Sequence, residues 1–96
     1  MDANIERLHS HLINALSAAQ EQYKTAQAAV SAAKAELKAA QAAGDLTQTR
    51  ILYQNLRNVE RSAAHAEARV MCARGDLMRF ENLYRLNRSA ARRRRS

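Results

Sequence analysis

The sequence predicts an all-α fold: a long antiparallel helical hairpin with an Ala-rich coiled-coil interface. The chain of 96 residues has no Pro and only 2 Gly, and it is rich in the strong helix formers Ala, Leu, Gln, Glu, Lys and Arg. Apolar residues recur alternately three and four positions apart on both sides of Gly44-Asp45. That spacing is typical of a coiled coil rather than of a general amphipathic helix.

The first helix is expected over about residues 3–43. Its apolar seam, the row of residues at heptad a and d positions, is interrupted only by His9. From Leu16 onward every second seam position is Ala, which lets two helices approach closely. The seam comprises Ile5, His9, Leu12, Leu16, Ala19, Tyr23, Ala26, Val30, Ala33, Leu37 and Ala40.

Gly44-Asp45 is the predicted turn between the two helices. Gly suits the left-handed position just past a helix end. Asp45 can cap the next helix, and Gln48 would complete an Asp-x-x-Gln variant of the capping box. An αα-hairpin with a minimal loop is expected.

The second helix is expected over about residues 46–91. With the turn centred on residues 44 and 45, the numbers of facing residues add up to 89, and every seam position then meets a seam position. Leu16 should face Ala73, and Tyr23 should face Ala66. The second seam comprises Thr49, Leu52, Leu56, Val59, Ala63, Ala66, Val70, Ala73, Leu77, Phe80 and Tyr84. The agreement of the two seams predicts one domain over residues 1–91.

Gly75-Asp76 allows a competing topology. Residues 73–77 resemble residues 42–46, so a duplication would place a second turn here and a short third helix over 76–91. We favour a continuous helix, with a kink at Gly75-Asp76 as an alternative, because the apolar seam continues past this point. A Gly inside a helix costs about 1 kcal/mol relative to Ala.

A single hairpin of this size cannot enclose a core by itself, so self-association is expected. Apolar residues beside the seam would remain in water in a monomer. A homodimeric four-helix bundle would bury them. The predicted self-association residues are Leu8, Ile13, Ile51, Tyr53, Met71, Met78, Leu83 and Leu86.

The net charge of +7 is concentrated at the C-terminal end. The last twelve residues carry six Arg and no acid, and residues 92–96 are expected to be a disordered basic tail. Guanidinium groups bind phosphate in a bidentate way, which predicts an electrostatic contact with DNA or RNA. The predicted nucleic-acid-binding residues are Arg85, Arg88, Arg92, Arg93, Arg94 and Arg95.

Other interpretations of these charges stay open. The tail could complement the negative end of the helix dipole, or be attracted to acidic protein or membrane surfaces. Arg50, Arg57 and Arg61 add positive charge to the second helix, but Glu60 and Glu67 are expected to interrupt a continuous basic stripe.

The remaining polar residues indicate no chemistry. His9 and His11 lie on different faces of a helix, so we expect no metal site, and His9 opposite Phe80 is expected to help fix the register. Cys72 is expected to be a small packing residue at a helix–helix boundary. No phosphate-binding loop or nucleophile–base pair is present, so neither catalysis nor a cofactor is expected.

Two features of the sequence bear on localisation. No apolar run approaches the ~20 residues that a membrane span needs. The N-terminus, with Asp2 and Glu6, lacks the pattern of a signal peptide. A cytoplasmic protein is therefore expected.

The close-packed Ala seam, short turn and expected dimer resemble the architecture of the Rop-type plasmid copy-control proteins, which are helical hairpins that bind RNA. The resemblance is architectural and carries over no RNA-contacting residue. Two functions follow as hypotheses. One is a non-enzymatic coiled-coil protein that self-associates and contacts nucleic acid through its Arg-rich end. The other is a protein–protein interaction module, such as an assembly chaperone or a component of a larger machine, that binds helical partners.

Overall fold

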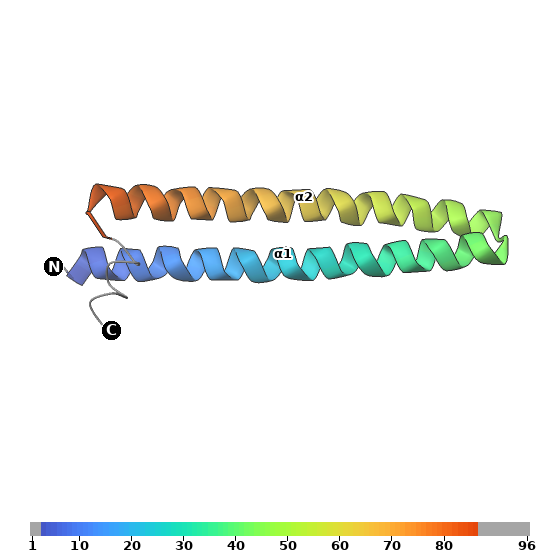
Figure 1. The fold of residues 1–96 in the computed structure, drawn as a ribbon, viewed down its shortest axis with the longest axis horizontal. Coiled ribbons are helices and arrows are strands. Elements are labelled where there is room, and N and C mark those ends of the chain that lie inside the picture. The colour runs from blue at the N-terminus through green and yellow to red at the C-terminus, as the bar shows by residue number, and fades with distance from the viewer. Residues whose placement is uncertain (1–2, 87–96) are drawn as a thin grey trace.

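Two long antiparallel helices make up the described part of the chain. The computed structural model describes residues 3–86, in which α1 spans Ala3–Ala43 and α2 spans Leu46–Leu83. Figure 1 shows the helices side by side along their whole length, so that α1 begins where α2 ends. The longest dimension is 64 Å. The predicted all-helical hairpin is confirmed.

The turn at Gly44-Asp45 closes one helix and opens the next. Gly44 has φ +73°, and its N–H donates to the Gln41 carbonyl at 3.1 Å. The Asp45 N–H donates to the Ala40 carbonyl at 3.2 Å, which completes a Schellman motif. The Asp45 carboxylate then accepts from the N–H of Gln48 at 3.0 Å and caps α2.

The predicted capping box is therefore only half right. The side chain of Asp45 caps α2 as expected. The N–H of Asp45 was expected to bind the Gln48 side chain, but it is engaged by the end of α1 instead. Because the loop is so short, Asp45 is at once the residue that follows the end of α1 and the N-cap of α2. Its N–H donates to the Ala40 carbonyl of α1 and is not free to bind Gln48.

The core follows the predicted seam. All eight buried residues between positions 3 and 86 are seam residues, four on each helix. The central cluster holds Ala33, Leu37 and Leu56, with Val30, Leu52 and Val59 packed against it. These six residues are three of the facing pairs that the turn-centred register predicts.

Helix α2 runs through Gly75 without a break, so the competing topology with a second turn there is wrong. Gly75 lies off the seam, and the Arg79 guanidinium folds over it. An added Cβ at Gly75 would lie 3.6 Å from Arg79 Nη1, an ordinary contact. The Arg79 side chain also pairs with Asp76 at 2.6 Å.

The expected end of the second helix at about residue 91 is wrong, because α2 ends at Leu83. Arg85 adopts φ 55°, and its N–H donates to the Asn82 carbonyl at 3.3 Å. The Leu86 N–H donates to the Glu81 carbonyl at 2.7 Å. This is a second Schellman motif, with Arg where Gly is usual, so no Gly marks it in the sequence.

The two glycines should respond to Ala in opposite directions. Gly44→Ala should lower the free energy of unfolding by about 1 kcal/mol, because the left-handed conformation is strained with a Cβ. Gly75→Ala should raise it by up to about 1 kcal/mol through helix propensity. Urea unfolding of both variants at one protein concentration measures this. Equal destabilisation by the two substitutions would contradict the described conformations.

Candidate interaction surfaces

Most of the predicted self-association residues are exposed in a single chain. Leu8, Ile51, Tyr53, Met71, Met78 and Leu83 have between 53% and 73% of their surface accessible. The other two, Ile13 and Leu86, are partly buried. Leu46, at 83% exposed, and Tyr84, at 43%, join the exposed set. Leu46 was not singled out in the sequence because it follows the cap directly, and Tyr84 leaves the seam because α2 ends before it.

These exposed apolar side chains gather toward the two ends of the hairpin. Leu46, Ile51 and Tyr53 lie near the turn. Leu8, Leu83 and Tyr84 lie at the opposite end, with Met71 and Met78 nearby on α2. Within the described residues, no large exposed apolar side chain lies between positions 54 and 70. The middle of α2 is therefore polar and the ends are apolar.

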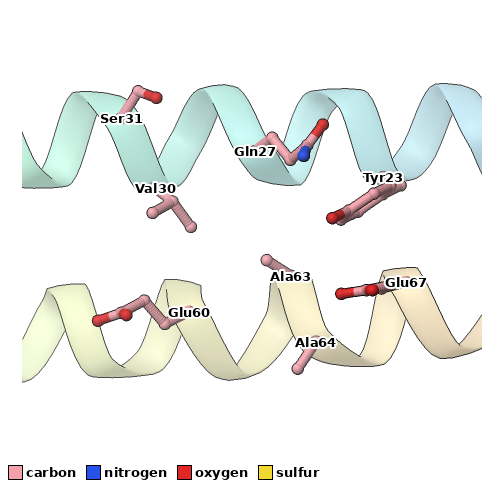
Figure 2. Close-up of a pocket in the computed structure, with 8 residues that line it drawn as sticks. All are labelled: Tyr23, Gln27, Val30, Ser31, Glu60, Ala63, Ala64 and Glu67. Carbon is pink, nitrogen blue, oxygen red and sulfur yellow. The ribbon is translucent and has the colours of Figure 1, made fainter.

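A shallow groove opens between the helices near their midpoint. Its lining residues are Tyr23, Gln27, Val30 and Ser31 from α1 and Glu60, Ala63, Ala64 and Glu67 from α2. Figure 2 shows Val30 and Ala63 in the space between the ribbons, with the Glu60 and Glu67 carboxylates on either side of Ala63. The hollow forms because Ala63 and Ala64 are too small to fill it. No ligand-specific arrangement of polar groups accompanies it.

The groove shows where Glu60 and Glu67, which were expected to interrupt the Arg residues of α2, direct their side chains. Each glutamate follows a seam residue by one position, which turns its side chain toward α1. Arg50 instead lines a different hollow with Ile51, Gln54, Asn55 and Asn58. Glu60 and Glu67 therefore line a different hollow of α2 from Arg50.

At the open end of the hairpin, His9 contacts both Phe80 and Glu81. Its ring stacks on Phe80 with centroids 5.9 Å apart and planes 16° apart. Its Nε2 lies 2.9 Å from the Glu81 carboxylate, and the two side chains are only 21% and 15% exposed. Tyr84 extends the ring cluster, 4.8 Å from Phe80.

This cluster bears on the register. The predicted position of His9 opposite Phe80 is confirmed, because the two rings stack. The contact with Glu81 was not predicted, although the same register puts Glu81 one residue from the facing position. A polar bond between α1 and α2 that needs both side chains in place favours a single register over a slipped one.

Of the predicted nucleic-acid-binding residues, the structure describes only Arg85. Arg85 is exposed and begins the turn that follows α2. Arg88 and Arg92 to Arg95 lie outside the described residues. Of the Arg residues in α2, Arg69 donates to the Gln22 side chain at 3.4 Å and Arg79 pairs with Asp76.

The sequence predicted that Cys72 packs at a helix–helix boundary. This prediction is wrong, because Cys72 is exposed. It precedes the seam residue Ala73, and one step along a helix rotates a side chain by roughly 100°. For Cys72 that rotation leads away from α1.

Three further findings concern the chain as a whole. Among residues 3–86, no group of three or more His, Cys, Asp or Glu side chains is placed to hold a metal ion. Neither described helix is long and apolar enough to cross a membrane. Comparison with protein-family models, curated proteins and solved structures found no match to this chain.

The His9–Glu81 contact should contribute measurably to stability. In a double-mutant cycle with His9→Ala and Glu81→Gln, we expect a coupling free energy of about 1 kcal/mol, since both side chains are mostly buried. The exposed Asp76–Arg79 pair is the matched control and should couple by less than about 0.5 kcal/mol. Urea denaturation of the wild type, the four single variants and the two double variants tests both. Equal coupling in the two pairs would contradict a special role for His9.

Proposed function

We propose that this protein is a non-enzymatic helical hairpin that self-associates and contacts nucleic acid through its Arg-rich C-terminal end. One observation carries the nucleic-acid part: six Arg and no acid in the last twelve residues of the chain, starting at Arg85. Nucleic acid presents one negative charge per nucleotide, so several Arg side chains can be neutralised by one bound strand. The interaction is electrostatic and specifies no base sequence.

Helix capping is a weaker explanation for this charge. The last turn of α2 already has carbonyls bonded to the N–H groups of Tyr84, Arg85 and Leu86. A cation near a helix C-terminus contributes only about 0.3–1 kcal/mol, and the effect fades beyond the last turn. Arg92 to Arg95 lie nine or more residues after Leu83. The helix dipole therefore does not account for their charge, and we propose nucleic acid as the partner.

Self-association is proposed as a homodimeric four-helix bundle. A two-helix core with no fully buried side chain leaves large apolar residues in water at both ends of the hairpin. When two copies lie side by side along their length, both ends of one copy are covered at once. Burying apolar surface stabilises such a dimer by roughly 25 cal/mol per Å².

The same surface favours one alternative, a protein–protein interaction module without a nucleic-acid role. Met71 and Met78 lie one heptad apart on α2, and both are more than half exposed. Flexible Met side chains adapt to varied apolar partners. A helical partner could cover these residues in place of a second copy.

Tail deletion tests the nucleic-acid contact. The full-length protein should shift labelled 20-mer DNA and RNA in gels at low salt and release them as salt rises. Deleting residues 88–96 removes five Arg and should lower the slope of log K against log salt by up to about 4.5 for duplex DNA. Because the chain has no Trp, an elevated ratio of absorbance at 260 to 280 nm in the purified protein would reveal bound nucleic acid. Absence of any shift at low salt would refute the contact.

Sedimentation equilibrium tests the dimer. The wild-type chain of 10.8 kDa should sediment as a dimer in the micromolar range under reducing conditions. Leu8→Gln with Leu83→Gln should weaken the dimer at least ~10-fold, because each replaces an exposed apolar contact. The control pair Ala28→Gln with Ala35→Gln, also exposed but on the outer side of α1, should have no effect. A monomer at all concentrations, or a larger effect of the control pair, would contradict the proposed interface.

A further inference from the structure

We infer that the outward side of α2 carries a second contact surface for the phosphodiester backbone of nucleic acid, separate from the C-terminal tail. This inference rests on the proposed nucleic-acid function. We name the surface the α2 basic face. It comprises Arg50, Gln54, Asn55, Arg57, Asn58 and Arg61.

The six side chains share one side of the helix and are all exposed. Arg50 and Arg57 are one heptad apart, and Arg61 follows one turn later. With ~1.5 Å of rise per residue, the three Arg cover about 16 Å along the axis, roughly five nucleotide steps of one strand. Arg50, Gln54, Asn55 and Asn58 line one shallow hollow. The face is thus a compact arrangement of guanidinium and amide groups.

No acidic residue shares this face. Between Leu46 and Gly75 the only acids are Glu60 and Glu67. Both line the interhelical groove with Tyr23 and Gln27, on the side of α2 that is turned toward α1 (Figure 2). Glu60, three positions after Arg57, borders the face, while its side chain lines the groove on the other side.

Within residues 3–86, no Arg side chain of the face forms an ion pair or a side-chain hydrogen bond. The ion pairs in the described chain are His9–Glu81 and Arg79–Asp76, and neither involves the α2 basic face. Arg57 and Arg61 are like charges four positions apart, a spacing that destabilises a helix. A bound polyanion would remove this repulsion and supply the missing partners.

The composition of the face favours nucleic acid over a protein partner. Among the residues that line the hollow, Ile51 is the one apolar side chain, whereas the centres of protein interfaces are rich in apolar and aromatic groups. Amide side chains beside Arg are common donors to phosphate and sugar oxygens. Apart from Ile51 and Tyr53, the large exposed apolar residues of the described chain lie outside the stretch from Arg50 to Arg61.

A matched pair of triple variants of the full-length chain tests the inference. Arg50→Gln, Arg57→Gln and Arg61→Gln remove three charges from the α2 basic face. Lys24→Gln, Lys34→Gln and Lys38→Gln remove three from exposed positions of α1. Gln keeps helix propensity close to that of Arg and Lys, so circular dichroism and melting curves should match the wild type. Binding to a 20-bp DNA duplex, an RNA duplex of the same sequence and polyglutamate is measured by fluorescence anisotropy from 0.05 to 0.3 M salt.

The Arg triple should bind duplex ~10- to 100-fold more weakly at 0.15 M salt, with the slope against log salt reduced by about 2.7 for DNA. The Lys triple should stay within about threefold of the wild type. Arg50→Lys, Arg57→Lys and Arg61→Lys should restore most of the slope, because a phosphate contact needs the charge. The preferred duplex identifies the nucleic acid.

Several results would overturn the inference. Equal losses in the Arg and Lys triples would mean that net charge alone controls binding. A loss confined to polyglutamate would assign the face to an acidic protein. Unchanged duplex binding by the Arg triple, with binding lost on deletion of 88–96, would refute the α2 basic face and leave the proposed function intact. No duplex binding by the wild type would refute both.

Discussion

The two-residue turn at Gly44-Asp45 is the constraint on which the rest of the hairpin depends. Gly44 adopts the left-handed conformation. The Asp45 N–H donates to a carbonyl of α1, and the Asp45 carboxylate accepts from an N–H of α2. The two-residue loop has no spare length that would let one helix slide along the other, so each seam residue has one facing position. An interface rich in Ala needs this, because small side chains interlock weakly and a slip of one heptad would leave much the same contacts. At the far end, His9 with Phe80 and Glu81 favours the same register.

The Ala seam brings the helices close but leaves a thin core. Among residues 3–86, half of the eight buried residues are Ala, and no side chain is fully buried. Helix propensity and the length of the seam must therefore supply much of the stability, since burial of small side chains contributes little. The larger apolar residues that a thicker core would hold lie outside it, at the two ends of the hairpin. This is the physical basis for proposing a second copy.

The sequence predicts this fold well where local signals agree with periodicity, and less well where side-chain direction or an unusual cap decides. At the Gly44-Asp45 turn, for example, the local turn signal agrees with the apolar seams on both sides of it. The end of α2 could not be predicted, because Arg85 occupies a left-handed position that Gly usually marks. Glu81 was missed because a seam analysis ignores the neighbours of seam residues. The groove that Glu60 and Glu67 line was not predicted, because it depends on their angle around the helix rather than on their distance along the chain.

The separation of surfaces makes the two proposed contacts compatible. The α2 basic face occupies the stretch from Arg50 to Arg61, and of the large exposed apolar side chains only Ile51 and Tyr53 fall within that stretch of the described chain. A second copy that leaves Ile51 exposed also leaves this face free, and such a dimer would present two such faces and two Arg-rich ends on one rod. Contacts linked by a rigid scaffold act at high effective concentration, so individually weak phosphate contacts become strong together. A long and thin hairpin suits that purpose better than a compact bundle, because its length sets the distance between the contacts.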